Sequence, residues 1–143
     1  MSTDIKPDHV LAAEELESYF ARRAGWQNLK PTMPYARPIV DSEQWEHRLW
    51  LLHLNGETFE YKTGIGIKKA PTAAQIIASY CRDYLDARDY DGFEDWAGNF
   101  GYDSDSRKAE TIYRKCLAIG PKLGNAGLAR DEIKKLAELS RRL

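Results

Sequence analysis

Basic side chains between residues 107 and 118 are the clearest candidate for binding chemistry in this sequence. At helical spacing, four of them form two rows on the side opposite the apolar positions, with small residues between the rows. The rows are Arg107 with Arg114 and Lys108 with Lys115, and Thr111 and Ala118 lie between them. Such a surface suits a phosphate backbone or a carboxylate-rich protein. The alternative interpretation is a solvated helix face without a partner.

A second candidate surface is acidic and precedes the basic one. Carboxylates recur from residue 83 to residue 95, and a belt of this kind can imitate nucleic-acid phosphates toward a basic protein. The alternative is a solvated surface whose carboxylates serve as helix caps. The belt comprises Asp83, Asp86, Asp89, Asp91, Glu94 and Asp95. Its last four members join the four basic residues as candidate partner-binding positions.

The spacing of the histidines and acidic runs disfavours a metal site. His47 and His53 are six residues apart on one predicted strand, which separates them by about 20 Å. That distance is too long for two ligands of one ion. The acidic runs at 89–91 and 103–105 lack the Gly and Glu that complete an EF-hand loop. We therefore expect no metal ion.

Motifs for nucleotide binding and nucleophilic catalysis are weak or missing. Gly64 and Gly66 follow a predicted strand, but the third glycine of the dinucleotide pattern and the Lys-Ser/Thr ending of a phosphate loop are absent. A strand-end bend explains these glycines, and a phosphate contact by Lys68 and Lys69 is the less favoured alternative. Both cysteines fall on apolar helix faces, and there is no Gly-x-Ser-x-Gly turn. We expect no cofactor and favour a protein that is not an enzyme.

Charge is divided unevenly along the 143 residues (16.4 kDa), although the formal net charge is only −1. Residues 41–106 hold six basic and thirteen acidic side chains, a net of −7, whereas residues 107–143 hold ten basic and four acidic, a net of +6. Opposite blocks of this size either neutralise each other within the fold or present two differently charged surfaces. We favour neutralisation. The pI of about 6.3 argues against a protein that mainly coats nucleic acid.

Length and composition predict one packed domain. The chain contains four Trp, eight Tyr and four Phe, which supply the bulky side chains that a disordered chain lacks. No stretch approaches 18 consecutive apolar residues, and the first ten residues contain no apolar signal core. We expect a soluble protein of the cytoplasm with no membrane partner.

A β-hairpin is the clearest local signal of structure. Asn55 and Gly56 suit the two positive φ values of a type I′ turn between two runs of strand formers. Folding about this turn pairs Leu52 with Phe59 and residue 50 with residue 61 on the core side. The same register pairs residue 51 with residue 60 and residue 49 with residue 62 on the other face. A short third strand at Pro38–Val40 is a further expectation.

Apolar periodicity and capping signals predict helices around the hairpin. Capping boxes start two of them, at Thr72 with Gln75 and at Asp91 with Glu94. We predict helices from about Asp8 to Ala24, Thr72 to about Ala87, Asp91 to about Phe100, Ser104 or Asp105 to Gly120-Pro121, and about Arg130 to Leu143. The expected inward residues include Leu11, Leu16, Tyr19 and Phe20 in the first helix and Phe93, Trp96, Phe100 and Tyr102 around the third.

The predicted architecture is α+β: one β-hairpin, or a small three-stranded antiparallel sheet, covered by four to five helices. Three of the six prolines lie between residues 31 and 38 and indicate an extended connector after the first helix. We divide the chain into an N-terminal helix at 1–25, a Pro-rich connector at 26–44, and an α+β core domain with a C-terminal helix at 45–143.

The segment FEDWAGNFGYDSDSRKAETIYRKC, Phe93–Cys116, resembles a widespread group of small phage and prophage proteins, most of them uncharacterised. LNGETFEYKTGIG and PTAAQIIASY fit the hairpin and helix that precede this motif in the group. The resemblance covers about Trp45 to Leu117. It implies a phage or mobile-element accessory protein and implies no catalytic residue.

Two functional hypotheses follow from the charged surfaces and this resemblance. The leading one is a non-enzymatic phage-type binding protein that inhibits a host defence system, as an anti-CRISPR protein does, by occluding a protein or ribonucleoprotein effector. The alternative is a nucleic-acid-binding accessory protein of phage replication or regulation that uses the same basic helix. An enzyme acting on a nucleotide or a host protein is the least favoured class.

Overall fold

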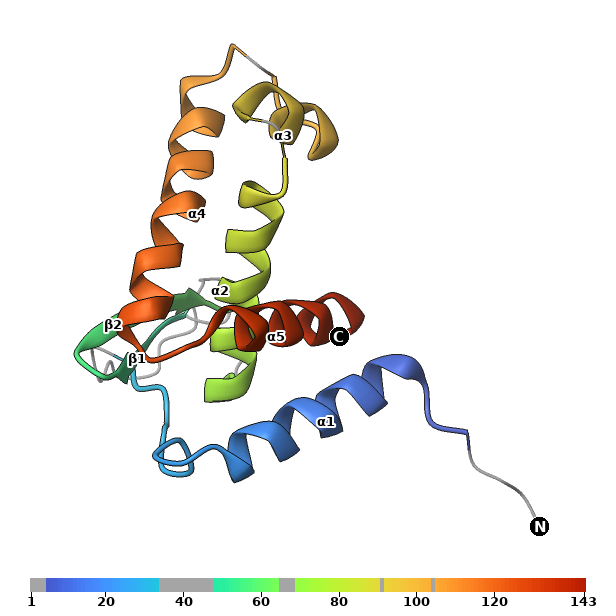
Figure 1. Ribbon diagram of the computed structural model, residues 1–143, viewed down its shortest axis with the longest axis vertical. Coiled ribbons are helices and arrows are strands. Elements are labelled where there is room, and N and C mark those ends of the chain that lie inside the picture. The colour runs from blue at the N-terminus through green and yellow to red at the C-terminus, as the bar shows by residue number, and fades with distance from the viewer. Residues whose placement is uncertain (1–4, 34–47, 65–68, 91, 104) are drawn as a thin grey trace, which may run out of the picture.

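The computed structural model of the chain describes residues 5–33, 48–64, 69–90, 92–103 and 105–143. Within these ranges the protein has five helices and a two-stranded antiparallel sheet, which confirms the predicted α+β class (Figure 1). The elements are α1 (Asp8–Arg22), β1 (Leu49–Leu54), β2 (Glu57–Lys62), α2 (Ala73–Arg88), α3 (Phe93–Asn99), α4 (Arg107–Asn125) and α5 (Arg130–Arg142).

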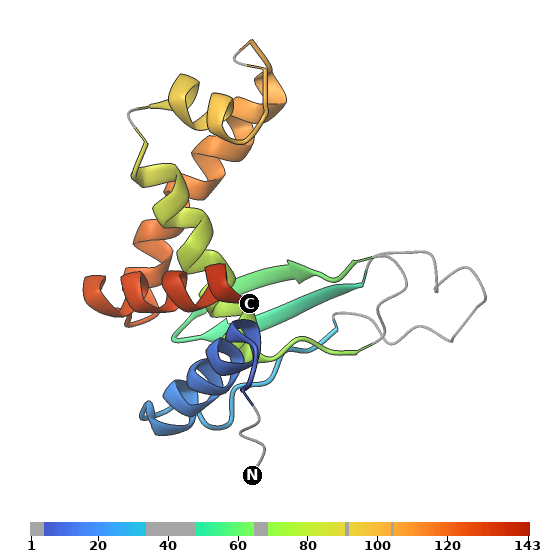
Figure 2. The same ribbon diagram turned by 90° about the vertical axis from the view of Figure 1, so that its right-hand side faces the viewer.

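The hairpin has the predicted turn and register. Asn55 and Gly56 have φ values of 49° and 82°, as a type I′ turn requires. Leu52 pairs with Phe59, and the pairs 50–61, 51–60 and 49–62 are also formed. Leu52 and Phe59 are completely buried, because they face the helices. Figure 2 shows the strands extending sideways from the place where the helices meet.

The principal core joins the hairpin to α1, α2 and α5. It contains Leu52 and Phe59 from the strands, Ile76 and Ile77 from α2, and Leu136 from α5. The predicted capping box begins α2: the Thr72 hydroxyl accepts from the Gln75 amide, and the Gln75 side chain accepts from the Thr72 amide. Beyond this core, α2 and α4 run side by side and α3 lies at their far end (Figure 1).

Helix α1 packs on the same core. Ala12, Leu16 and Phe20 are buried, whereas Leu11, which we predicted to face inward, is 45% exposed. A stripe centred on residues 12, 16 and 20 turns position 11 toward solvent. The helix ends at Arg22, two residues before the predicted end, and Gly25 has the expected left-handed conformation with φ +84°.

A single bridge extends the hairpin on the β1 side. Thr32 and Leu51 exchange backbone hydrogen bonds of 2.8 and 2.7 Å, which fix the end of the segment after α1 against the strand. The predicted third strand, Pro38–Val40, lies outside the described residues. The predicted division of the chain near residue 44 also falls in a range that the structure does not describe and stays a prediction.

Helix α4 corrects one predicted boundary. We expected Gly120-Pro121 to end it, but the helix continues through Pro121 to Asn125. Pro121 lacks only the N–H that would bond the carbonyl of residue 117, and the extra turn places the completely buried Leu123 in the core. The glycine serves close packing instead: a Cβ at Gly120 would lie 2.5 Å from Cε1 of Tyr84.

The α3 region corrects the predicted cap and part of the predicted core. Gly92 is the N-cap of α3 and no side chain caps the helix, so the predicted box of Asp91 with Glu94 does not begin it; Asp91 lies outside the described residues. Trp96 is buried, but Phe100 and Tyr102 are 44% and 42% exposed. Helix α3 has only seven residues, and of these only Trp96 and Ala97 are buried. The rings of Phe100 and Tyr102 pack against the Trp96 ring.

Candidate functional site

The outer side of α4 carries the predicted basic rows. The helix begins at Arg107, because the Ser106 hydroxyl accepts a 3.2 Å hydrogen bond from the Ala109 amide. Ala109 and Leu123 face inward, which turns the opposite side of the helix to solvent. We call this side the cationic face; its residues are all exposed and are Arg107, Lys108, Thr111, Arg114, Lys115 and Ala118.

Most of the charge on the cationic face is not neutralised. Arg114 donates to Glu110 at 2.8 Å, an exposed i,i+4 pair of small energetic value. Arg107, Lys108 and Lys115 form no ion pair with any residue that the structure describes. Three free cations and one weakly paired arginine therefore face solvent along one helix.

Helix α5 differs, because three of its five cations contact carboxylates of other helices. Arg141 lies 2.7 Å from Asp86 of α2, and Arg142 lies 2.7 Å from Asp8 of α1. Lys135 lies 3.6 Å from Glu15. The hydrogen bond from Arg142 lowers the pKa of Asp8. The basic block of the sequence is thus partly neutralised on α5 and largely free on the outer side of α4.

The acidic candidates are also divided. Asp86 is paired with Arg141, and burial raises the pKa of Asp83, whose carboxylate lies 3.7 Å from Arg82. Asp89 and Glu94 are exposed near the α2–α3 junction, and Asp95 is exposed on α3. Asp91 lies outside the described residues. Part of the acidic belt therefore takes part in internal contacts, while the members nearest α3 face solvent.

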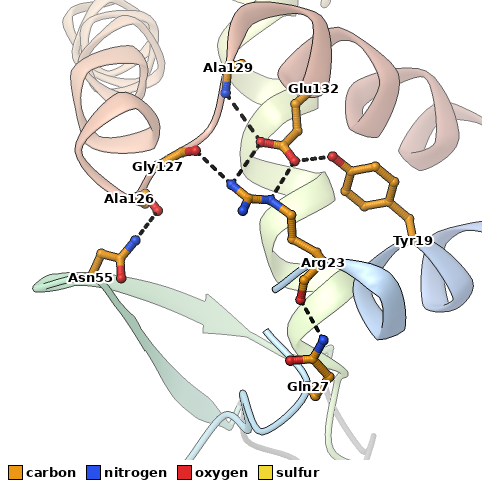
Figure 3. A network of polar contacts seen from close by, with 8 residues as sticks. All are labelled: Tyr19, Arg23, Gln27, Asn55, Ala126, Gly127, Ala129 and Glu132. Atoms are coloured by element: carbon orange, nitrogen blue, oxygen red, sulfur yellow. Dashed lines mark hydrogen bonds and ion pairs between the residues drawn. The ribbon is translucent and has the colours of Figure 1, made fainter. Parts of the chain in front are cut away.

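A polar network fixes α1, the hairpin and the start of α5 relative to one another (Figure 3). Glu132 accepts a 2.9 Å hydrogen bond from Arg23 Nε, another from the Tyr19 hydroxyl, and a 3.3 Å bond from the Ala129 amide at the start of α5. Burial, followed by the bond to Glu132, raises the pKa of Tyr19 to about 12. The side chain of Glu132 is only 9% exposed, whereas that of Arg23 is 32% exposed, so the carboxylate is the shielded member of this ion pair.

Two further bonds of this network hold the C-terminal end of α4. The Asn55 side-chain amide in the hairpin turn donates to the Ala126 carbonyl at 2.7 Å, and Arg23 Nη2 donates to the Gly127 carbonyl at 2.9 Å (Figure 3). These carbonyls follow the last turn of α4, where backbone acceptors otherwise lack partners. The hairpin and α1 therefore anchor the base of the helix that presents the cationic face.

An exposed aromatic edge lies next to the N-terminal end of α4 and was not predicted. Trp96 stacks on Tyr102 with a centroid distance of 5.2 Å, and Phe100 contacts Trp96 and Tyr90 at 5.5 and 5.8 Å. The sequence motif pointed to a core, because four aromatics within ten residues resemble buried packing. The short length of α3 was the available signal that not all of them can be covered.

The other predicted chemistries have no assembled site in the described residues. No group of three or more His, Cys, Asp or Glu side chains there is placed to hold a metal ion. Burial raises the pKa of Cys81 to about 12 and that of Cys116 to about 11, so neither thiol is activated. The possible phosphate bend at 64–66 with Lys68 lies mostly outside the described residues.

None of the helices in the described ranges is both long enough and apolar enough to cross a membrane. Comparisons with protein-family models, with curated proteins and with solved structures found no match to this chain. The candidate site therefore depends on its own geometry, and the resemblance to phage accessory proteins stays a prediction.

Proposed function

We propose that this chain is a non-enzymatic binding protein whose cationic face docks on an acidic surface of a partner. The proposed partner is a protein or ribonucleoprotein effector of a host defence system, which the chain inhibits by occlusion. The resemblance of residues 45–117 to phage accessory proteins supports the biological setting. The free charge on α4 supports the mode of action.

One contrast carries the proposal. On α5, three of the five cations are paired: Lys135 with Glu15, Arg141 with Asp86 and Arg142 with Asp8. Arg107, Lys108 and Lys115 have no carboxylate partner in the described residues. Folding thus leaves a net positive strip on α4 in a chain whose formal charge is −1. Such strips steer association with oppositely charged partners and give selectivity against others.

Charge reversal with a matched control tests this proposal. The variant Lys108→Glu/Lys115→Glu changes two lysines of the cationic face, and Lys62→Glu/Lys134→Glu changes two exposed lysines on β2 and α5. Each alters the net charge by the same amount. We expect the first variant to lose partner capture from a host lysate, and inhibition of the effector, by tenfold or more, while the control keeps both. Equal behaviour of the two variants would remove the cationic face from the mechanism.

A specific observation favours the alternative, nucleic-acid binding, as the second candidate. Arg107, Lys108 and Lys115 span about 12 Å of one exposed helix, as a phosphate-backbone contact requires. The same capture experiment, repeated after nuclease treatment, separates the two functions. Partner capture that survives nuclease supports the protein-binding proposal. Capture that disappears, together with direct DNA or RNA binding that weakens steeply with salt, supports the alternative.

A further inference from the structure

A second basic feature lies between helices α2, α4 and α5, apart from the cationic face. These helices line a cavity of about 340 Å³. Two arginines contribute to its wall: Arg88 is the last residue of α2, and Arg130 is the first residue of α5. The volume falls within the range of about 300–1,000 Å³ that small-molecule sites occupy.

Neither arginine has a counterion in the described part of the chain. The neighbouring arginines on the same helices are paired: Arg82 with Asp83 on α2, and Arg141 with Asp86 between α5 and α2. Arg88 and Arg130 form no such contact, and none of the described residues that line the cavity is a carboxylate. Two guanidinium groups that share one cavity without a carboxylate favour an anionic ligand.

The rest of the wall suits an apolar or aromatic body. Tyr84 offers its ring, and Leu128 and Ile133 supply aliphatic contacts. Gly124 forms part of the wall, and a Cβ placed there would meet no atom within 4 Å. The glycine therefore leaves space that a larger side chain at position 124 would fill.

We propose that this cavity binds a small phosphomonoester, with Arg88 and Arg130 holding the phosphate and Tyr84, Leu128 and Ile133 contacting its carbon body. A phosphomonoester carries a charge of nearly −2 and three terminal oxygens, which matches two guanidinium groups and their several N–H donors. A carboxylate offers one charge and two oxygens, so a single arginine would satisfy it.

Binding of three matched probes tests the proposal: phenyl phosphate, inorganic phosphate and benzoate, each titrated by calorimetry or NMR at constant ionic strength. We expect phenyl phosphate to bind best, because it offers both the phosphate and the ring. The variants Arg88→Gln and Arg130→Gln should each weaken it by about tenfold or more, the loss expected for a charge-assisted contact. Gly124→Leu should abolish binding while keeping the helical circular dichroism and the melting temperature.

Three results would overturn the proposal: no binding of phenyl phosphate at millimolar concentration, equal affinity for benzoate, or unchanged affinity in both arginine variants. If Gly124→Leu fails to fold, the arginine variants still decide the outcome. The Lys108→Glu/Lys115→Glu variant should bind phenyl phosphate as the original chain does, because both lysines lie on the outer side of α4. Loss of this ligand and loss of the docking partner are therefore separate outcomes.

Discussion

Gly120 lies where the backbone of α4 meets the Tyr84 ring of α2. A methyl group at this position would lie 2.5 to 2.8 Å from three atoms of the Tyr84 side chain, two in the ring and the hydroxyl oxygen, whereas one at Gly124 would meet nothing within 4 Å. We expect Gly120→Ala to lower the free energy of unfolding by about 1 kcal/mol, because overpacking exceeds the gain in helix propensity. Gly124→Ala should raise it by about 0.5–1 kcal/mol. Urea unfolding of both variants measures the difference, and a stabilising Gly120→Ala would show that the Tyr84 ring moves aside at little cost.

Single residues also show what the sequence can and cannot predict about the candidate site. Helical periodicity is a local property, and it correctly predicted that Arg107, Lys108 and Lys115 are exposed. The pairing of Arg142 with Asp8 joins residues 134 positions apart, so only the packing of α1 against α5 reveals it. The cavity could not be predicted from the sequence for the same reason, because Arg88 and Arg130 come together only when three helices pack.

At the scale of elements, Glu132 joins α5 to the end of α1 through a partly buried ion pair with Arg23. We expect Glu132→Gln to lower the free energy of unfolding by about 1–3 kcal/mol, because Arg23 loses a charged acceptor that is largely shielded from water. Glu110→Gln is the matched control: it removes the exposed pair with Arg114 and should cost less than about 0.5 kcal/mol. Chemical denaturation compares the two, and equal losses would show that Glu132 contributes no more than a surface charge.

The elements differ in how far local sequence determines them. The hairpin and the start of α2 were predicted correctly, because Asn55-Gly56 and Thr72 with Gln75 act within a few residues of themselves. The end of α4 was predicted wrongly, because burial of Leu123 outweighs the hydrogen bond that Pro121 removes. Local signals therefore fix the hairpin turn and the start of α2, while tertiary packing decides where α4 ends.

Across the whole molecule, the basic block at 107–143 is neutralised in part where α5 touches α1 and α2. Where α5 contacts α1 and α2, basic side chains form ion pairs with acidic ones, as Arg142–Asp8 and Arg141–Asp86 show. Helix α4 contacts α2 and α3 on one side only, so its opposite side keeps its charge. The unpaired cations of the cationic face therefore lie on the side of α4 that faces away from these two helices.

The free energy of unfolding should also fall at high pH, because the fold buries groups that ionise there. Burial raises the pKa of Cys81 from 9.0 to about 12, and that of Tyr19 from 10.0 to about 12. A raised folded-state pKa means that the folded chain holds the proton more tightly than the unfolded chain. The stabilising contribution is therefore complete below pH 9 and is lost as pH rises toward 12.

Stability measured between pH 8 and pH 11 checks this linkage. We expect the free energy of unfolding to fall above pH 9, with Cys81 alone contributing about 1.4 kcal/mol per pH unit. The variant Cys81→Ala removes the thiol, so its curve should fall less steeply by that amount, whatever its stability at pH 8. Parallel curves for the two proteins would mean that the Cys81 thiol ionises as readily in the folded chain as in the unfolded one, which contradicts its complete burial between the hairpin and the helices.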